Sequence, residues 1–395
     1  MTIAPGDKIV MILTKTGLVA VKAVSPNLAG NKCLLIPDSS GKLVGIKLGA
    51  ISVGDKILMI PDSSGKLIAV KCGGIMPNPP TGWTDLFSPG QISYNSWAFE
   101  TWGNYIYYGA SGVGGGGAGY IERYSEAGGW EVALDSTYYF SYSVYCLKVF
   151  GTHLYAGHSG MGISNGGIAR SADGSYGSFA QVFDGGTESS YIQALETLGG
   201  KIYGIYYDSS IAQYKIISSA NGTTWNTIYT VPAGKMFYSL TTDGTSLYTI
   251  WLDLDVTPFV GDVYSSTDGI TWGSEGWSFA VGEYPVKVKY LNGHLYVGAY
   301  QMGRIYRDGV LVNSDIIAGA VWDFCECEDL LFAGSGYIST GTAKIWCSED
   351  NGVTWILNYQ PTGSYSSMEA LGSLGKRFYA GSSFNGDVFR SPEIK

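Results

Sequence analysis

The sequence predicts an all-β protein, a seven-bladed β-propeller preceded by a small domain of three repeated β-hairpins. Two internal repeats support this prediction. A cassette of one apolar residue, one aromatic residue and two mostly small residues occurs seven times between residues 106 and 381, with its aromatic positions 36 to 48 residues apart. A shorter repeat of 24 residues fills most of the first 76 residues. Short β-rich repeats of the longer period are typical of propellers, with one blade per repeat.

The cassette predicts two strands of each blade. An apolar residue stands eight positions before each aromatic residue, and a mostly small residue stands nine positions before it. Alternation of large and small side chains is a strand pattern, and both faces of a propeller sheet pack on neighbouring sheets. Glycine-containing turns between the two segments predict hairpins. The aromatic residues are Tyr107, Tyr155, Tyr203, Tyr248, Tyr296, Phe332 and Tyr379.

One strand of the last blade is predicted to come from the beginning of the propeller. After the last cassette the chain has room for only one more strand, whereas a blade normally has four. Residues 82–88 read like the segment around Trp225, where a fourth strand is expected. We therefore predict a propeller over residues 82–395 that is closed by a strand at 82–88, which leaves no open sheet edge.

Residues 1–76 predict a separate attachment or assembly domain. The segment 36–43 is nearly repeated at 60–67, and each copy is an apolar run with a Pro-Asp-Ser-Ser-Gly turn. Three such hairpins bury little by themselves, so we expect them to pack on copies of the chain, in a homo-oligomer, or on other proteins of a particle. A proline-rich linker is expected at 77–81. The six cysteines are expected to be small core residues, with a Cys33–Cys72 disulfide as the most plausible exception.

Three repeats continue into a second motif, Ser-x-Asp-Gly-x-Thr-Trp or a close variant, and a fourth repeat carries a weaker copy. In this motif Asp or Asn caps its own turn, Gly takes a positive φ and Trp packs between strands, so the motif is predicted to be structural. It resembles the Asp box, or bacterial neuraminidase repeat, of sialidase-like propellers. That resemblance places the motif between the third and fourth strands of a blade. Its residues are Asp173, Asn221, Trp225, Asp268, Trp272, Asp350 and Trp355.

Sialidase activity is not expected. The resemblance implies three arginines for a substrate carboxylate, a Tyr/Glu nucleophile pair and an acidic Asp. The arginine motif that this family carries early in its propeller is absent, and the chain has only six arginines, most of them near third strands. Without a recognisable catalytic constellation, the sequence predicts a protein that is not an enzyme and that needs no cofactor.

Composition favours a protein of a virion or of the extracellular surface. Charged residues make up 14% of the chain, and polarity comes instead from abundant Tyr and Gly-rich, hydroxyl-bearing segments. A net charge of −9 without a basic cluster argues against nucleic-acid binding, and no apolar run is long enough for membrane insertion. The N-terminus lacks the pattern of a classical signal peptide. The repeated hairpins loosely resemble modules of tailed-phage and viral structural proteins; a cytoplasmic location is the alternative.

A ligand is expected on the central face of the ring, where loops rich in Tyr, Ser and Gly come together. Such loops suit adaptable polar recognition, and aromatic rings stack on sugars. Three aspartates of one loop, Asp253, Asp255 and Asp262, are a weak calcium candidate, and no other metal site is expected. The candidate binding residues are Tyr138, Tyr139, Tyr142, His158, Tyr207, Trp251, Tyr300 and Tyr365.

The leading functional hypothesis from the sequence is a non-enzymatic binding or structural protein. Its hairpins would attach it to a particle, and its propeller would present a glycan- or protein-binding face. Two alternatives stay open: a glycoside hydrolase or lyase that uses loop carboxylates on a sialidase-like propeller, and an Asp-box protein-assembly factor. Two carboxylates facing one concave pocket would favour the enzyme.

Overall fold

The chain divides into two units, Met1–Met76 and Pro77–Lys395. The computed structural model describes six strands of the first unit and most of the second. The described residues of the second unit are 82–87, 95–111, 119–134, 143–160, 165–313, 319–336, 343–362, 365–383 and 386–394. These parts contain strands and no helix, which confirms the all-β class. They accordingly contain no helix of the length and apolarity that a membrane span requires.

The first unit consists of paired strands. In its four-stranded sheet, of order β2-β1-β5-β6, the strands β1 and β5 are parallel and the other neighbours are antiparallel. The strands β3 and β4 form a separate antiparallel pair. The predicted linker and the side chains of Cys33 and Cys72 lie outside the described residues. The strands are β1 (Ile9–Thr14), β2 (Gly17–Lys22), β3 (Cys33–Pro37), β4 (Leu43–Lys47), β5 (Lys56–Pro61) and β6 (Leu67–Cys72).

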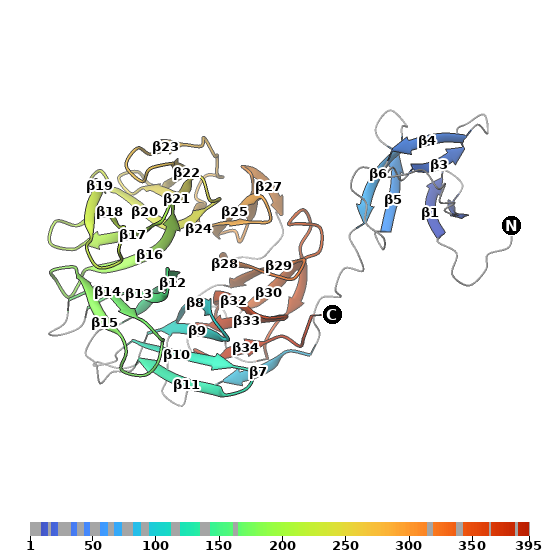
Figure 1. Cartoon of the computed structure of the whole chain (residues 1–395). Coiled ribbons are helices and arrows are strands. Elements are labelled where there is room, and N and C mark those ends of the chain that lie inside the picture. The colour runs from blue at the N-terminus through green and yellow to red at the C-terminus, as the bar shows by residue number, and fades with distance from the viewer. Residues whose placement is uncertain are drawn as a thin grey trace. The chain divides into compact units, whose positions relative to one another are not determined.

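The second unit is a propeller-like ring of antiparallel four-stranded sets (Figure 1). In chain order, and each given from its innermost strand outwards, the first sets are β8 (Ser96–Trp102), β9 (Tyr105–Ala110), β10 (Tyr120–Ser125) and β11 (Gly129–Leu134); β12 (Val144–Phe150), β13 (His153–His158), β14 (Gly167–Ser171) and β15 (Ala180–Asp184); and β16 (Tyr191–Leu198), β17 (Lys201–Asp208), β18 (Gln213–Ser219) and β19 (Asn226–Thr230). The next sets are β20 (Lys235–Thr242), β21 (Leu247–Asp253), β22 (Val260–Ser266) and β23 (Gly273–Ser274); and β24 (Tyr284–Leu291), β25 (His294–Gln301), β26 (Ile305–Arg307) and β27 (Val310–Asn313). The last sets are β28 (Gly319–Cys327), β29 (Leu330–Gly336), β30 (Lys344–Ser348) and β31 (Ile356–Tyr359); and β32 (Met368–Leu374), β33 (Arg377–Ser382) and β34 (Val388–Arg390), which β7 (Thr84–Phe87) completes.

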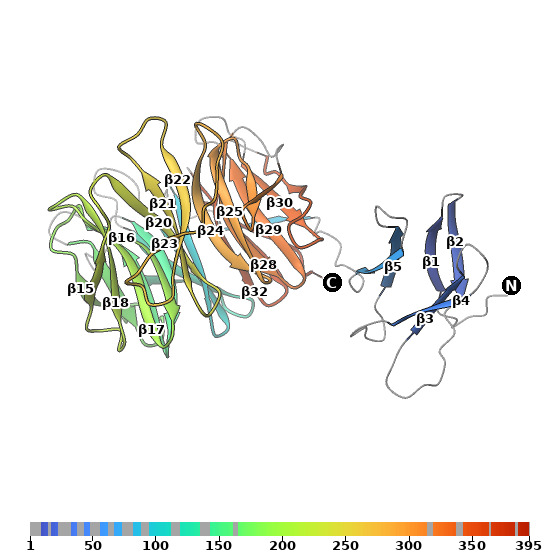
Figure 2. The same cartoon turned by 90° about the horizontal axis from the view of Figure 1, so that it is seen from above.

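The innermost strands stand around the axis of the ring (Figures 1 and 2). Each contacts the innermost strand of the next set, and β32 contacts β8, so the ring is continuous. A short pairing of β25 with β28, at Tyr300↔Ala320 and Gln301↔Gly319, joins two of the sets into one sheet. The end of the ring at which the innermost strands begin is called the central face below.

The cassette residues explain how neighbouring sheets fit together. All the cassette aromatics are buried except Tyr248, which is half-buried. In five of the cassettes a glycine stands two positions later and lets the next innermost strand approach closely. A Cβ at Gly157 would lie 2.7 Å from Ile192 Cγ2 of the next set, and one at Gly298 would lie 2.3 Å from the carbonyl oxygen of Val321. A large side chain at either glycine would therefore separate the sheets.

The turns between third and fourth strands connect the two repeated motifs. In the turn after β22, Asp268 Oδ1 accepts hydrogen bonds from the amides of Ile270 and Thr271, both 2.8 Å. Gly269 has φ 74° and packs against Tyr203, the cassette aromatic of the preceding set. The glycines Gly174, Gly222 and Gly352 lie in the same way against Tyr107, Tyr155 and Tyr296. Each of these turns thus positions a residue that supports the neighbouring sheet.

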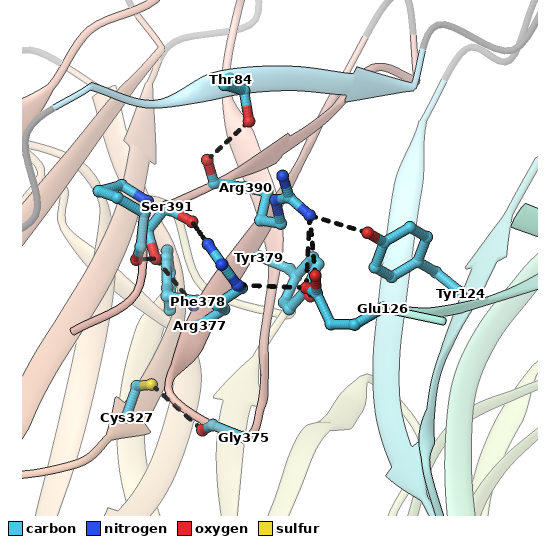
Figure 3. A network of polar contacts seen from close by, with 11 residues as sticks. Thr84, Tyr124, Glu126, Cys327, Gly375, Arg377, Phe378, Tyr379, Arg390 and Ser391 are labelled. Carbon is cyan, nitrogen blue, oxygen red and sulfur yellow. Dashed lines mark hydrogen bonds and ion pairs between the residues drawn. The ribbon is translucent and has the colours of Figure 1, made fainter. Parts of the chain in front are cut away.

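The ring closes where the last set meets the first. The strand β7 pairs with β34, and the side chain of Glu126, in the turn after β10, reaches across to the last set (Figure 3). Glu126 Oε1 accepts a hydrogen bond from the Tyr379 hydroxyl at 2.8 Å and lies 3.3 Å from Arg377 Nε. Its Oε2 lies 3.2 Å from a guanidinium nitrogen of Arg390. One carboxylate therefore binds three side chains across the closure.

Replacing Glu126 by alanine should weaken the closure. The change removes two ion pairs and a hydrogen bond and leaves two neighbouring guanidinium groups without that carboxylate, so we expect the free energy of unfolding to fall by about 1–2 kcal/mol. The matched control is Glu131→Ala, because Glu131 pairs with Arg123 within a single sheet at 2.6 Å. Denaturant titration should show a loss of about 0–1 kcal/mol for the control. Equal losses for the two variants would contradict a role in closure.

Candidate functional site

Every innermost strand has a register irregularity near its start, and these β-bulges point side chains towards the axis. In β8, for example, the register shifts between Ser96 and Ala98, and in β32 it shifts between Met368 and Ala370. A bulge re-aims the extra residue and bends its strand, and bulges are over-represented beside active sites. The side chains at the bulges are Trp97, Tyr145, Gln193, Tyr238, Val286, Trp322 and Glu369.

All these bulge residues line one cavity of about 150 Å³ on the axis. These bulge side chains form what is called below the upper layer of the cavity wall, and aromatic rings make up most of it. The rings of Trp97 and Tyr145 are 5.1 Å apart, centroid to centroid. The indole Nε1 of Trp97 is buried and makes no hydrogen bond within the described residues. The cavity therefore combines apolar ring faces with polar atoms that a ligand could bind.

Glu369 is the carboxyl group of this upper layer. Its Oε1 accepts a hydrogen bond from the Ser367 hydroxyl at 2.9 Å, and that hydroxyl is 2.7 Å from Ser383 Oγ. Its Oε2 is buried and makes no hydrogen bond among the described residues. Burial raises the pKa of Glu369 to about 7, although the two serine hydroxyls oppose the shift. This carboxyl can both give and take a proton near neutral pH.

A second layer of the cavity wall carries paired charges. Lys148 Nζ lies 2.5 Å from Glu196 Oε1, and Lys287 Nζ lies 2.9 Å from Asp323 Oδ1. Burial lowers the pKa of Lys289, but Asp323 and other nearby carboxylates outweigh this effect and raise it, so the ammonium stays charged. These lysines balance the carboxylates of their own layer.

The same layer links neighbouring sheets. Glu100 Oε1 accepts a hydrogen bond from the backbone amide of Val149 in the next sheet at 3.1 Å. Asp323 Oδ2 accepts one from the amide of Leu371 at 3.0 Å. Burial raises the pKa of Glu100, opposed by the charge of Lys148. These carboxylates satisfy backbone groups that would otherwise be buried without a partner, so they have a structural role that Glu369 lacks.

Of the residues predicted for a ligand site, none that the structure describes lines this cavity. Tyr207 packs on Tyr191 at 5.0 Å, and Tyr300 lies between Tyr284 at 4.9 Å and the cavity residue Trp322 at 5.9 Å, so these two adjoin the site. The residues Tyr138, Tyr139 and Tyr142 lie outside the described residues.

The other three predicted residues pack within the ring. Trp251 is stacked on Tyr264, with centroids 5.4 Å apart, and Tyr365 packs edge-on against Phe389. His158 is buried at the end of β13, and burial lowers its pKa to about 4, so the ring is neutral at physiological pH. Their aromatic character serves packing between strands.

The weak calcium candidate is not assembled. Asp253 and Asp255 both bind Lys235, the latter at 3.0 Å, whereas Asp262 accepts the amide hydrogen of Trp277 at 2.8 Å. A lysine ammonium already neutralises two of the three carboxylates, which is incompatible with a cation between them. Within the described residues no three His, Cys, Asp or Glu side chains are grouped to hold a metal ion.

The cavity residues could have been found from the sequence. Each bulge residue stands ten positions before a cassette aromatic, directly before the mostly small residue of the repeat. Aligning the repeats and comparing this one additional position would have shown four aromatic residues and, in the other repeats, Gln193, Val286 and Glu369. The strand pattern hid them, because a period-two pattern assumes no extra residue in the strand.

A second carboxyl group with a similar pKa lies outside the cavity. Glu122, in β10, is opposite Tyr108 of β9, and its Oε2 is buried without a hydrogen bond within the described residues. Burial alone raises the pKa of Glu122 to about 7. It resembles Glu369 in charge behaviour but does not line the cavity, which makes it a natural control residue.

Comparison with known proteins supports the propeller-like fold. A catalytically inactive variant of virginiamycin B lyase from Staphylococcus aureus, solved with quinupristin, matches with a TM-score of 0.56 and 11% identity over 76% of this chain and 95% of that chain. An ulvan lyase of a polysaccharide lyase family matches with a TM-score of 0.52 and 12% identity over 80% of this chain and 96% of that chain. A puromycin hydrolase matches with a TM-score of 0.52 and 12% identity over 78% of this chain and 53% of that chain. No protein-family model matches the chain, and no curated protein matches it.

These likenesses correct the leading functional hypothesis. The sequence predicted a non-enzymatic binding or structural protein, but the similar propellers are lyases and a hydrolase, so that prediction is wrong and the enzyme alternative fits better. The error arose because missing sialidase motifs exclude a sialidase and no other enzyme. At 11–12% identity the likeness itself establishes the fold.

Glu122→Gln should reduce the pH dependence of stability. The pKa is about 7 in the folded protein but about 4.3 in an unfolded chain, so between these values the folded state binds more protons. The stabilising contribution is therefore complete below about pH 4.3 and is lost as pH rises through about 7. We expect the drop in unfolding free energy from pH 5 to pH 8 to be smaller in the variant by about 1–3 kcal/mol. Denaturant titrations at both pH values measure it; identical drops would contradict the shifted pKa.

Proposed function

We propose that this protein is a glycan-cleaving enzyme, a glycoside hydrolase or lyase, in which Glu369 transfers the proton. One observation carries the proposal: a carboxyl with a pKa of about 7 faces an aromatic cavity on the propeller axis, with one oxygen held by Ser367 and the other without a hydrogen bond among the described residues. The likeness to propeller lyases and a hydrolase supports an enzyme of this kind.

The scaffold of this enzyme is, in our proposal, a seven-bladed propeller. Seven sequence cassettes, the unbroken contacts between innermost strands and the pairing of β7 with β34 all support this count. The pairing of β25 with β28 then joins the end of the second strand of the fifth blade to the start of the innermost strand of the sixth. Four turns with Ser and Asp or Asn caps support kinship with Asp-box propellers.

Both forms of glycan cleavage begin at a group like Glu369. In hydrolysis its protonated carboxyl would donate a proton to the glycosidic oxygen as the C–O bond breaks; water would add to the anomeric carbon, and the proton that this water loses would return to the Glu369 carboxylate directly or through solvent. In elimination its carboxylate would remove the proton beside a uronate carboxyl as the bond to the leaving oxygen breaks, and the leaving oxygen would take up a proton from the Glu369 carboxyl or from solvent. The aromatic faces of Trp97, Tyr145 and Trp322 would stack on the sugar rings.

The roles predicted for residues 1–76 remain predictions. Attachment to copies of the chain or to a particle, a phage-like origin of the hairpins and a virion or extracellular location are each consistent with an enzyme that acts on surface glycans. Light scattering of the full chain would measure whether it forms an oligomer.

Glu369→Gln should remove activity. Wild type would be screened on uronate polymers (polygalacturonate, alginate, hyaluronan) and neutral ones (xylan, dextran), with new reducing ends as the measure of cleavage and ultraviolet absorbance of an unsaturated uronate as the measure of elimination. We expect the variant to lose about 100-fold or more of kcat, because the amide cannot exchange the proton. Glu122→Gln is the matched control and should retain turnover.

The pH profile separates the two chemistries. If Glu369 acts as an acid, turnover falls as pH rises through about 7; if it acts as a base, turnover rises over the same interval. Full activity of Glu369→Gln on a substrate that wild type cleaves would overturn the assignment of this residue.

A further inference from the structure

Two rows of aromatic rings run across the central face, one on each side of Glu369. The first row is Trp97, Tyr145, Tyr191 and Tyr207, with successive centroids 5.1, 5.4 and 5.0 Å apart. The second row is Trp322, Tyr300, Tyr284 and Phe259, with centroids 5.9, 4.9 and 5.7 Å apart. Each row passes through several neighbouring sheets and begins inside the cavity.

Glu369 lies where the two rows begin. It sits at the bulge of β32, and the neighbouring innermost strands β28 and β8 carry Trp322 and Trp97 at the equivalent bulges. All three side chains line the same cavity. The carboxyl is therefore flanked by one indole from each row.

The outer ends of both rows reach solvent. Phe259 is 39% exposed, and its neighbour Val260 is 54% exposed. Tyr207, near the end of β17, is half-buried, and the connection from β17 to β18 carries Ile211, which is 52% exposed. Phe259 lies on a connection from a second to a third strand and Tyr207 just before one, and these connections belong to the central face. The rows therefore lead from solvent to the carboxyl from two directions.

The size of the cavity shows why these rows matter. Pockets that enclose a whole small-molecule ligand usually have volumes of about 300–1,000 Å³, whereas this one has about 150 Å³. It can enclose only a small part of a substrate, so most of the contact must be made outside it. Tyrosines, which make up most of the two rows taken together, offer apolar ring faces together with hydroxyls. Sugar rings present the matching combination of C–H faces and hydroxyls.

We infer that the substrate is a glycan polymer that lies on both rows at once and is cleaved internally. The inference rests on the proposed glycan-cleaving function and adds the substrate class and the mode of attack. Sugars on both sides of the scissile bond stack on the two rows, and the bond between them is presented to Glu369. An enzyme that removed terminal sugars would need a binding row on one side only.

The first experiment follows the products of the wild-type full chain on the best polymer of the screen above. Internal cleavage lowers solution viscosity before many reducing ends appear and releases long oligosaccharides first. Release of a single short product from the outset would overturn the inference while leaving the glycan-cleaving function intact.

The second experiment shortens the rows at their outer ends. Phe259→Ala and Tyr207→Ala should each lower kcat/KM on the polymer about tenfold and lower it by less on the shortest cleavable oligosaccharide. The control is Tyr176→Ala, because Tyr176 is 51% exposed on a third-to-fourth strand connection, at the opposite end of its sheet. Unchanged polymer turnover in both row variants would overturn the inference.

A binding measurement tests the inference even when the wild-type protein shows no detectable turnover. Affinity electrophoresis of Glu369→Gln through gels containing each polymer should show retardation that Phe259→Ala or Tyr207→Ala, added to it, weakens. Retardation of this kind without wild-type turnover would refute the cleavage function and sustain the polymer site. No retardation and no turnover on any of these polymers would refute both.

Discussion

The site depends on the closure of the ring. The strand β7 pairs with β34 across about 300 residues of sequence, and Glu126 binds Arg377, Arg390 and Tyr379 over the same boundary. That boundary runs between β32, which carries Glu369, and β8, which carries Trp97. If the first and last sheets separated, the carboxyl would lose one of its flanking indoles. Closure therefore assembles the cavity as well as removing two open sheet edges.

Within the cavity, the distribution of charge sets the carboxyl groups apart. Glu196 and Asp323 each have a lysine within ion-pair distance, and Glu100 accepts a backbone hydrogen bond from the next sheet. Glu369 has hydroxyl neighbours and no ion pair within the described residues. The cost of burying its charge is thus the least compensated, and this difference moves its pKa towards neutrality while lysines hold the deeper layer in place.

Much of the fold was predictable because its repeats follow simple packing rules. The cassette joins a buried aromatic to a glycine that allows close sheet contact, and both signals survive in sequence. The all-β class and the propeller-like ring followed from them. The site was less predictable: a bulge changes which side chain faces the axis without changing the hydrophobic pattern, so Glu369 and Trp322 went unnoticed. Tyr365 and Trp251 were chosen by composition, which does not distinguish a ring that binds a ligand from one that packs between strands.

The repeated bulge also separates the residues that hold the ring together from the residues that would select its ligand. Each sheet contributes one side chain to the upper layer of the cavity from the same backbone position, and its close contact with the cassette glycine of the preceding sheet lies one residue earlier, at Ile192 and Val321 for example. Gln193 and Val286 occupy two of these positions with quite different chemistry, and the backbone accommodates both. Such a ring can evolve towards a new ligand one position at a time, because a substitution at a bulge alters the lining of the cavity without disturbing the sheets that form it.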